Sequence, residues 1–126
     1  MLTINEGFNR IILFGNLRGD PELRKFESDQ SMLRMRLATN HSFVNRDGVR
    51  EDRAEWHAVT VWGSRAEGLS RVLCKGTFVL VEGHIRSYSH GEGAEKKFGT
   101  EVLAHNVIVG GTCRVEKSDD VDPVKS

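Results

Sequence analysis

EWHAVTVW, at residues 55–62, is the most informative stretch of the sequence. Side chains of a β-strand alternate between two faces, and here one face carries both valines: His57, Val59 and Val61. The other face carries both tryptophans: Trp56, Ala58, Thr60 and Trp62. We expect the valine face to point into a hydrophobic core, which turns both indoles outward. Outward indoles of this kind predict a binding or association surface.

Four further segments have the length and apolar patterning of strands, and they lie at residues 10–17, 31–39, 77–88 and about 98–109. In the second of them the core positions are Leu33, Met35 and Leu37, and arginines alternate with them. In the segment at 77–88 the expected core positions are Val79, Val81 and Ile85. Polar stretches at 45–53 and 89–97 predict loops, the first because it contains an Asp-Gly turn signal.

A short helix is predicted after residue 62. Ser64 and Glu67 fit a capping box. An apolar stripe follows: Ala66, Leu69, Val72 and Leu73. Lys75-Gly76 is a stop signal. The resulting order predicts a mainly β OB-fold, a five-stranded Greek-key barrel with one short helix between strands three and four. The pattern alone leaves an unrelated small α+β or barrel fold open. Residues 1–111 form this domain, and residues 112–126 are expected to be a short, flexible, slightly acidic tail.

Composition restricts the function. The chain has 126 residues, with 18 basic and 18 acidic side chains, so its formal net charge is zero. A neutral chain lacks a broad electrostatic attraction for nucleic acid, so a DNA site would need local clustering or other forces. The two cysteines form no CxxC pair and the histidines show no metal-ligand spacing, so no metal or other cofactor is expected.

Other classes of protein are disfavoured by what the sequence lacks. It shows no nucleophile–base pair and no carboxylate pair of a catalytic site, so no enzyme is expected. It shows no signal-peptide core and no apolar run of membrane-spanning length, so no membrane association is expected. We therefore expect a cytoplasmic protein.

The expected outer faces mix aromatic and basic side chains. The aromatic members are Phe43, Trp56, Trp62 and Tyr88, with His90 on the same strand face as Tyr88. The basic members are Arg34, Arg36 and Arg86. Unpaired bases stack on such rings, with about 1–3 kcal/mol lost per ring removed, and phosphates pair with the nearby cations. Plainer interpretations stay open: tryptophans packed against a neighbouring subunit, Phe43 as a loop anchor, Tyr88 as an ordinary strand residue, and solvated arginines.

Several blocks of the sequence resemble bacterial and organellar single-stranded DNA-binding proteins. These blocks are NRIILFGNLRGDPELR (9–24), LATN (37–40), EWHAVTVWG (55–63), KGTFVLVEGHIR (75–86) and TEV (100–102). They occur in the order and spacing of that family and span most of residues 9–111. Each block is weak alone, but the ordered set is highly specific.

The resemblance implies an OB-fold homotetramer that binds single-stranded DNA in replication, recombination and repair. The family's stacking aromatics fall on Phe43, Trp56 and Trp62, and a further one falls on Tyr88 or His90. Its phosphate-contacting residues match Arg10, Arg24, Lys75 and Arg86, and a histidine near its subunit interface matches His57. The family often has basic residues where Ala58 and Ser64 stand, so fewer ionic contacts are expected.

The tail departs from the family as well. Many bacterial members end in an acidic tip with a terminal phenylalanine, on which replication and repair proteins dock. Residues 112–126 contain Asp119, Asp120 and Asp122 but end in Pro-Val-Lys-Ser, so docking by that route is not expected. Two alternative functions remain: a protein-association module that uses the same aromatic face, and an RNA-binding or primosome-type OB protein.

Overall fold

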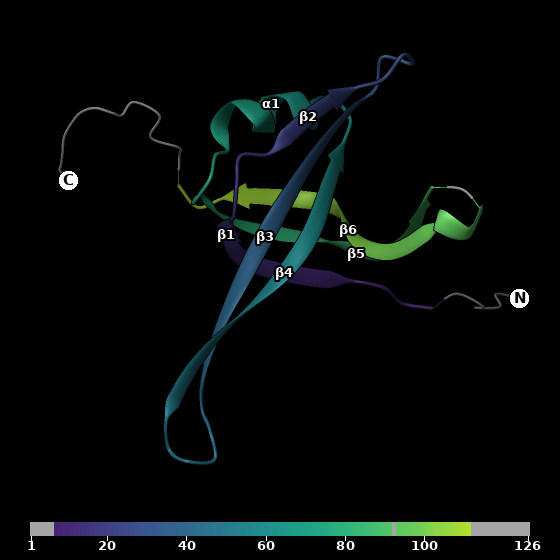
Figure 1. Cartoon of the computed structure of the whole chain (residues 1–126). Helices are drawn as coiled ribbons and strands as arrows, with labels where there is room; N and C mark the ends of the chain where they lie inside the picture. Colours follow the sequence, from purple (N-terminus) through teal and green to yellow (C-terminus); the bar gives the residue numbers. More distant parts are fainter. Residues whose placement is uncertain (1–6, 92, 112–126) are drawn as a thin grey trace, which may run out of the picture.

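The structure is a computed structural model, and it describes residues 7–91 and 93–111 (Figure 1). The predicted tail at 112–126 lies outside the described residues, and so does the side chain of His90. The elements, in chain order, are β1 (Ile11–Leu17), β2 (Glu22–Lys25), β3 (Ser31–Val44), β4 (Arg50–Trp62), α1 (Ser64–Val72), β5 (Phe78–His90), the 3₁₀ helix η1 (Gly93–Glu95) and β6 (Lys97–Val109). No helix in the described part of the chain is long and apolar enough to cross a membrane.

Five of these strands close into a barrel. The sheet runs in the order β1-β5-β6-β4-β3-β2, and an additional pairing of β1 with β3 closes the ring. Helix α1 connects β4 to β5, which are the third and fourth barrel strands. The predicted OB-fold is therefore confirmed. The short strand β2 was not predicted, because its four exposed residues carry no apolar alternation; it pairs with the outer edge of β3.

Barrel closure depends on a glycine in β1. Gly15 pairs with Val79 of β5, and the next residue, Asn16, pairs with both β5 and Ala38 of β3. A Cβ atom on Gly15 would lie 2.1 Å from the carbonyl oxygen of Ala38. Only glycine lets the two backbones approach this closely, so β1 can pass from one neighbour to the other here.

The core consists of the predicted inward faces. Its largest fully buried apolar side chains are Leu17, Leu33, Leu37, Val59, Val61, Val79 and Val81. Thr60, which was expected to face outward with the tryptophans, is also buried. The valine face of β4 is thus inward, as expected, and Trp56 on the opposite face is 44% exposed. Ile85 is an exception to the predicted core of β5, since it is 42% exposed. It keeps the parity of Val79 and Val81, because the bulge near Gly83 adds its extra residue to β6 and not to β5. Ile85 lies beyond Gly83, where the pairing of β5 with β1 ends, so β1 no longer flanks it.

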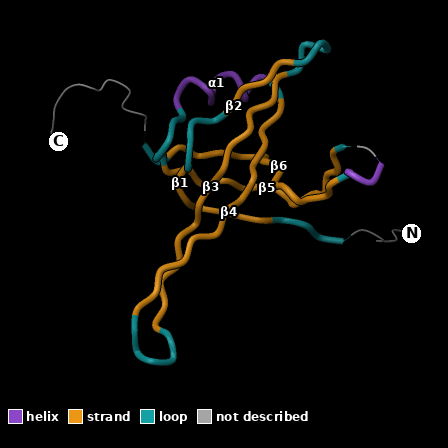
Figure 2. The backbone as a smooth tube through the Cα atoms, in the orientation of Figure 1, coloured by secondary structure: helices purple, strands orange, loops and turns teal. Residues whose placement is uncertain are grey.

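Both predicted polar loops are shorter than expected, because strand pairing continues into them. β3 and β4 stay paired as far as Val44 and Arg50, and the turn is held by the Asn45 Oδ1 atom, which accepts hydrogen bonds from the amides of Asp47 and Val49. The hairpin projects well beyond the barrel (Figures 1 and 2). β5 and β6 form a second projecting hairpin, paired as far as His90 and Lys97.

The helix forms as expected, but without the predicted capping box. Gly63 is the N-cap residue and no side chain caps the helix. Glu67 instead accepts a hydrogen bond of 2.8 Å from the Ser31 hydroxyl and pairs with Lys25 Nζ at 3.1 Å. These contacts attach α1 to β2 and β3, and Ala66 and Leu73 are buried against the core while Val72 is 39% exposed.

Candidate nucleic-acid interface

A groove of about 930 Å³ runs across one side of the barrel. Its lining comes from β2, β3, β4, the hairpin of β5 and β6, and the segment between β1 and β2. The predicted site residues that line it are Arg34, Arg36, Trp56, His57 and Tyr88. The fold therefore brings together residues from three separate strands, and the other predicted residues lie elsewhere.

Trp56 lies in the groove with arginines beside its ring. The Arg18 guanidinium carbon is 4.3 Å from the ring centroid, and that of Arg36 is 6.0 Å away. Both distances are in the range of cation–π attraction. Arg18, which follows β1, was not predicted as a site residue. Its amide donates to the Arg36 carbonyl oxygen of β3, a pairing between distant segments that no local pattern in the sequence indicates.

Tyr88 lies across the hairpin from Gly99. A Cβ atom at Gly99 would lie 2.7 Å from the Tyr88 hydroxyl oxygen and 2.9 Å from its Cε1 atom, so the ring lies directly over the glycine. The absence of a side chain at position 99 leaves room for this arrangement. The Tyr88 ring therefore packs against the backbone of Gly99 and lines the groove.

Trp62 lies outside the groove lining. Its ring stacks on Phe26, with centroids 5.6 Å apart and planes 19° from parallel. The residue is half-buried, and its indole nitrogen has no hydrogen-bond partner within the described part of the chain. One face of the ring is therefore already covered by Phe26.

Phe43 was expected to share the face of Trp56 and Trp62. The structure places it on the opposite face. Alternation continues without interruption along the extended β3, so Phe43 has the parity of Leu37 and pairs with Glu51. It stacks on His41 at 5.8 Å, and the Arg53 guanidinium lies 5.4 Å from its ring. These residues form a separate aromatic and basic cluster on the projecting hairpin.

The predicted basic residues fall into two groups. Arg10 pairs with Glu82, and the Arg86 Nε atom donates to Glu101 at 2.8 Å, so nearby carboxylates balance both charges. Within the described residues, no ion pair involves the others: Arg24, Arg34, Arg36 and Lys75. Arg34 and Arg36 are the two of these that line the groove. Together with Arg18 they outnumber the two carboxylates in its lining, Asp20 and Glu22, on a chain of zero net charge.

His57 is half-buried and lines the groove. Its Nε2 atom lies 3.0 Å from the Thr39 hydroxyl, a hydrogen bond whose direction depends on the tautomer.

Glu67 of α1 lies outside the groove lining. Its pKa is lowered from the ordinary value, chiefly because it accepts the hydrogen bond from Ser31 and secondly because of Lys25. Among the described residues, no cluster of three or more potential metal ligands is found.

Comparison with known proteins defines the family. Residues 8–110 match the Single-strand binding protein family, and the chain belongs to this family. It is 37% identical over 107 residues to "Single-stranded DNA-binding protein 1" of Chlorobaculum tepidum, covering 83% of this chain and 66% of that protein.

Solved structures agree with the fold. A deletion mutant of the single-stranded DNA-binding protein from Thermus aquaticus superimposes with a TM-score of 0.73 at 26% identity, over 84% of this chain and 52% of that one. The Plasmodium falciparum SSB in complex with ssDNA gives a TM-score of 0.75 at 21% identity, over 85% of this chain and 98% of that one. The chain thus spans about two thirds of the Chlorobaculum protein and half of the Thermus chain.

Proposed function

We propose that this chain binds single-stranded DNA without sequence preference, by stacking bases on aromatic rings and pairing phosphates with arginines. The observation that carries the proposal is Trp56, which is 44% exposed in a groove beside Arg34 and Arg36, two arginines without ion pairs in the described residues. Relatives whose names state single-stranded DNA binding support it. The protein holds the strand and catalyses no reaction on it.

The physical basis is an exchange of contacts at Trp56. A base that stacks on the indole replaces the Arg18 guanidinium, which is then available to a phosphate. Every base has a π-face, so stacking tolerates any sequence. Several stacked bases supply affinity that a neutral chain cannot obtain from charge alone. The cluster around Phe43 extends the same kind of surface along the projecting hairpin.

We further propose that copies of the chain associate, as a homotetramer, through the outer surface of β1, β5 and β6. Large apolar side chains are exposed there, and we call this surface the apolar face: Ile12, Phe14, Phe78 and Ile108. Phe14 pairs with Leu80, which in turn pairs with Ile108, so these residues form one continuous patch. A continuous apolar patch of this kind indicates association. The assembled protein acts in replication, recombination and repair in the cytoplasm.

The test is a titration of the protein with dT oligomers of increasing length, followed by tryptophan emission. We expect quenching, because stacking on Trp56 changes the environment of its indole. The same titration with ssRNA separates a DNA-binding from an RNA-binding function. The absence of quenching at low salt would count against the proposal, since the electrostatic part of binding is strongest there.

A further inference from the structure

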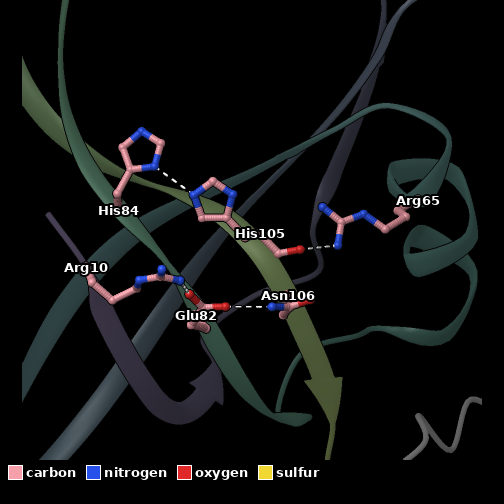
Figure 3. Close-up of polar contacts among 6 residues, drawn as sticks. All are labelled: Arg10, Arg65, Glu82, His84, His105 and Asn106. Atoms are coloured by element: carbon pink, nitrogen blue, oxygen red, sulfur yellow. Dashed lines mark hydrogen bonds and ion pairs between the residues drawn. The ribbon is translucent and has the colours of Figure 1, made fainter. Parts of the chain in front are cut away.

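His84 and His105 lie next to each other on β5 and β6, outside the groove (Figure 3). The Nδ1 atom of His84 is 2.8 Å from the Nε2 atom of His105, and the ring centroids are 4.9 Å apart. One nitrogen of each imidazole therefore points at the other ring. Neither histidine has a role in the DNA binding proposed above.

A β-bulge brings the pair together. Glu82 pairs with Asn106, but the next residue of β5, Gly83, pairs with Ala104, so β6 contains one extra residue, His105. An extra residue interrupts alternation and redirects a side chain. Consequently His105 and its neighbour Asn106 are both exposed, whereas Ala104 is buried. Gly83 permits this approach of the strands, since a Cβ atom there would lie 2.0 Å from the Leu103 carbonyl oxygen.

The surroundings hold the pair in place. Arg65 of α1 donates a hydrogen bond to the carbonyl oxygen of His105, which fixes the bulge from one side (Figure 3). In the adjacent row, Asn106 Nδ2 donates to Glu82 at 2.6 Å, and Glu82 also pairs with Arg10. The positive charge of Arg10 is thus balanced, and Arg65 is directed at backbone carbonyls (Figure 3).

We propose that His84 and His105 form a two-imidazole site for a divalent transition-metal cation such as Cu²⁺, Ni²⁺ or Zn²⁺. Imidazole nitrogen is a favoured ligand of these ions. Metal–nitrogen bonds of about 2.0–2.1 Å place two nitrogens on one ion roughly 3 Å apart, close to the 2.8 Å observed between the two rings.

Binding requires a change of tautomer and a rotation of the two rings, because nitrogens that share a hydrogen bond aim at each other and must turn to aim at one ion. The proton shared between the two facing nitrogens moves to the outer nitrogen of its own ring, so both facing lone pairs become ligands and both rings stay neutral. A ring that is protonated beforehand releases its proton to solvent. Water occupies the remaining coordination positions, because no third metal ligand joins the pair within residues 7–91 and 93–111. We therefore expect an open, weak site.

The first test is a titration of the untagged full chain with Cu²⁺, Ni²⁺ and Zn²⁺ after treatment with a chelator. We expect one site, tightest for Cu²⁺. His84→Ala and His105→Ala should each weaken binding by at least about tenfold, since even the loss of a group that only orients a metal ligand costs 10–100-fold. His41→Ala is the matched control, because His41 is an exposed strand histidine that stacks on Phe43. Unchanged affinity in either pair variant, or an equal loss in His41→Ala, would overturn the proposal.

A second measurement uses the unaltered chain, in case a variant disturbs the bulge. The electron paramagnetic resonance spectrum with one equivalent of Cu²⁺ should show coupling to two imidazole nitrogens, and coupling to one alone would contradict the site. Quenching by dT oligomers should be the same in His84→Ala as in the wild-type chain. The metal site and the DNA-binding function therefore fail or succeed independently.

Discussion

The groove and the apolar face both expose aromatic rings, but they surround them differently. Trp56 in the groove is 44% exposed and Phe78 on the apolar face is 49% exposed, so exposure does not separate them. Trp56 has two guanidinium groups within 6.0 Å of its ring, whereas Phe78 has the ring of Phe14 at 5.8 Å. The neighbours of an exposed ring, more than its exposure, indicate whether it meets a nucleic acid or another protein surface.

The largest effect is expected from a charge placed on the apolar face. Ile12→Asp should abolish association of the chain, because an unpaired carboxylate would be buried at the proposed contact between copies. Sedimentation velocity measures the result as a loss of mass. Val49→Asp is the matched control, since Val49 is a comparably exposed aliphatic residue in the turn between β3 and β4. If Ile12→Asp keeps the wild-type mass, copies do not meet at the apolar face.

The next effect concerns the two aromatic rings themselves. Trp56→Ala should weaken binding of a short dT oligomer by about 1–3 kcal/mol, the loss of one stacked base. Phe78→Ala should leave that affinity unchanged, because its ring lies on the apolar face. Fluorescence anisotropy of a labelled oligomer measures both. Equal losses in the two variants would remove the distinction between the groove and the apolar face.

A smaller effect should separate the unpaired arginines from the paired ones. Arg36→Ala should reduce the slope of log affinity against log salt by about 0.7, the contribution of one phosphate contact on a single strand. Arg86→Ala should instead lower the free energy of unfolding by about 1–3 kcal/mol, because it leaves the carboxylate of Glu101, which is 7% exposed, without its partner. Binding at several salt concentrations and urea unfolding distinguish the two. An unchanged salt slope in Arg36→Ala would mean that this arginine meets no phosphate.

The smallest effect lies away from both surfaces, at the contact between α1 and β3. The pKa of Glu67 is lowered in the folded chain, chiefly by the Ser31 hydrogen bond. The ionised carboxylate therefore stabilises the fold at a pH above the ordinary carboxyl pKa. This stabilisation is lost as the pH falls through the pKa of Glu67 in the folded chain. Glu67→Gln should therefore be less stable than the wild type at neutral pH, with the difference shrinking in acid. Thermal unfolding at several pH values measures this, and DNA binding should not change. A constant difference at all pH values would refute the assignment.

Local alternation in the sequence was sufficient for the barrel core and for the outward direction of Trp56. Val59, Val61, Val79 and Val81 are all fully buried, as their spacing predicts, because a strand must place every second side chain on the same face. The order of strands and helix likewise predicted the OB-fold. The same alternation continues past the expected end of β3 and places Phe43 on the face opposite to Trp56. The prediction that Phe43 shares the tryptophan face was wrong because the strand was taken to stop at residue 39.

The tertiary structure decided which distant residues meet. Arg18 lies against Trp56 because the chain after β1 stays beside β3, where the Arg18 amide donates to the Arg36 carbonyl oxygen. Phe26 covers Trp62 after the unpredicted strand β2. His84 and His105 are 21 positions apart, and they become neighbours only because a bulge in β6 turns His105 outward. Alternation is a property of a single strand, so it can be read along the chain. Strand registers, bulges and the order of strands in the sheet depend on contacts between two strands, so they cannot be read along one segment of the sequence.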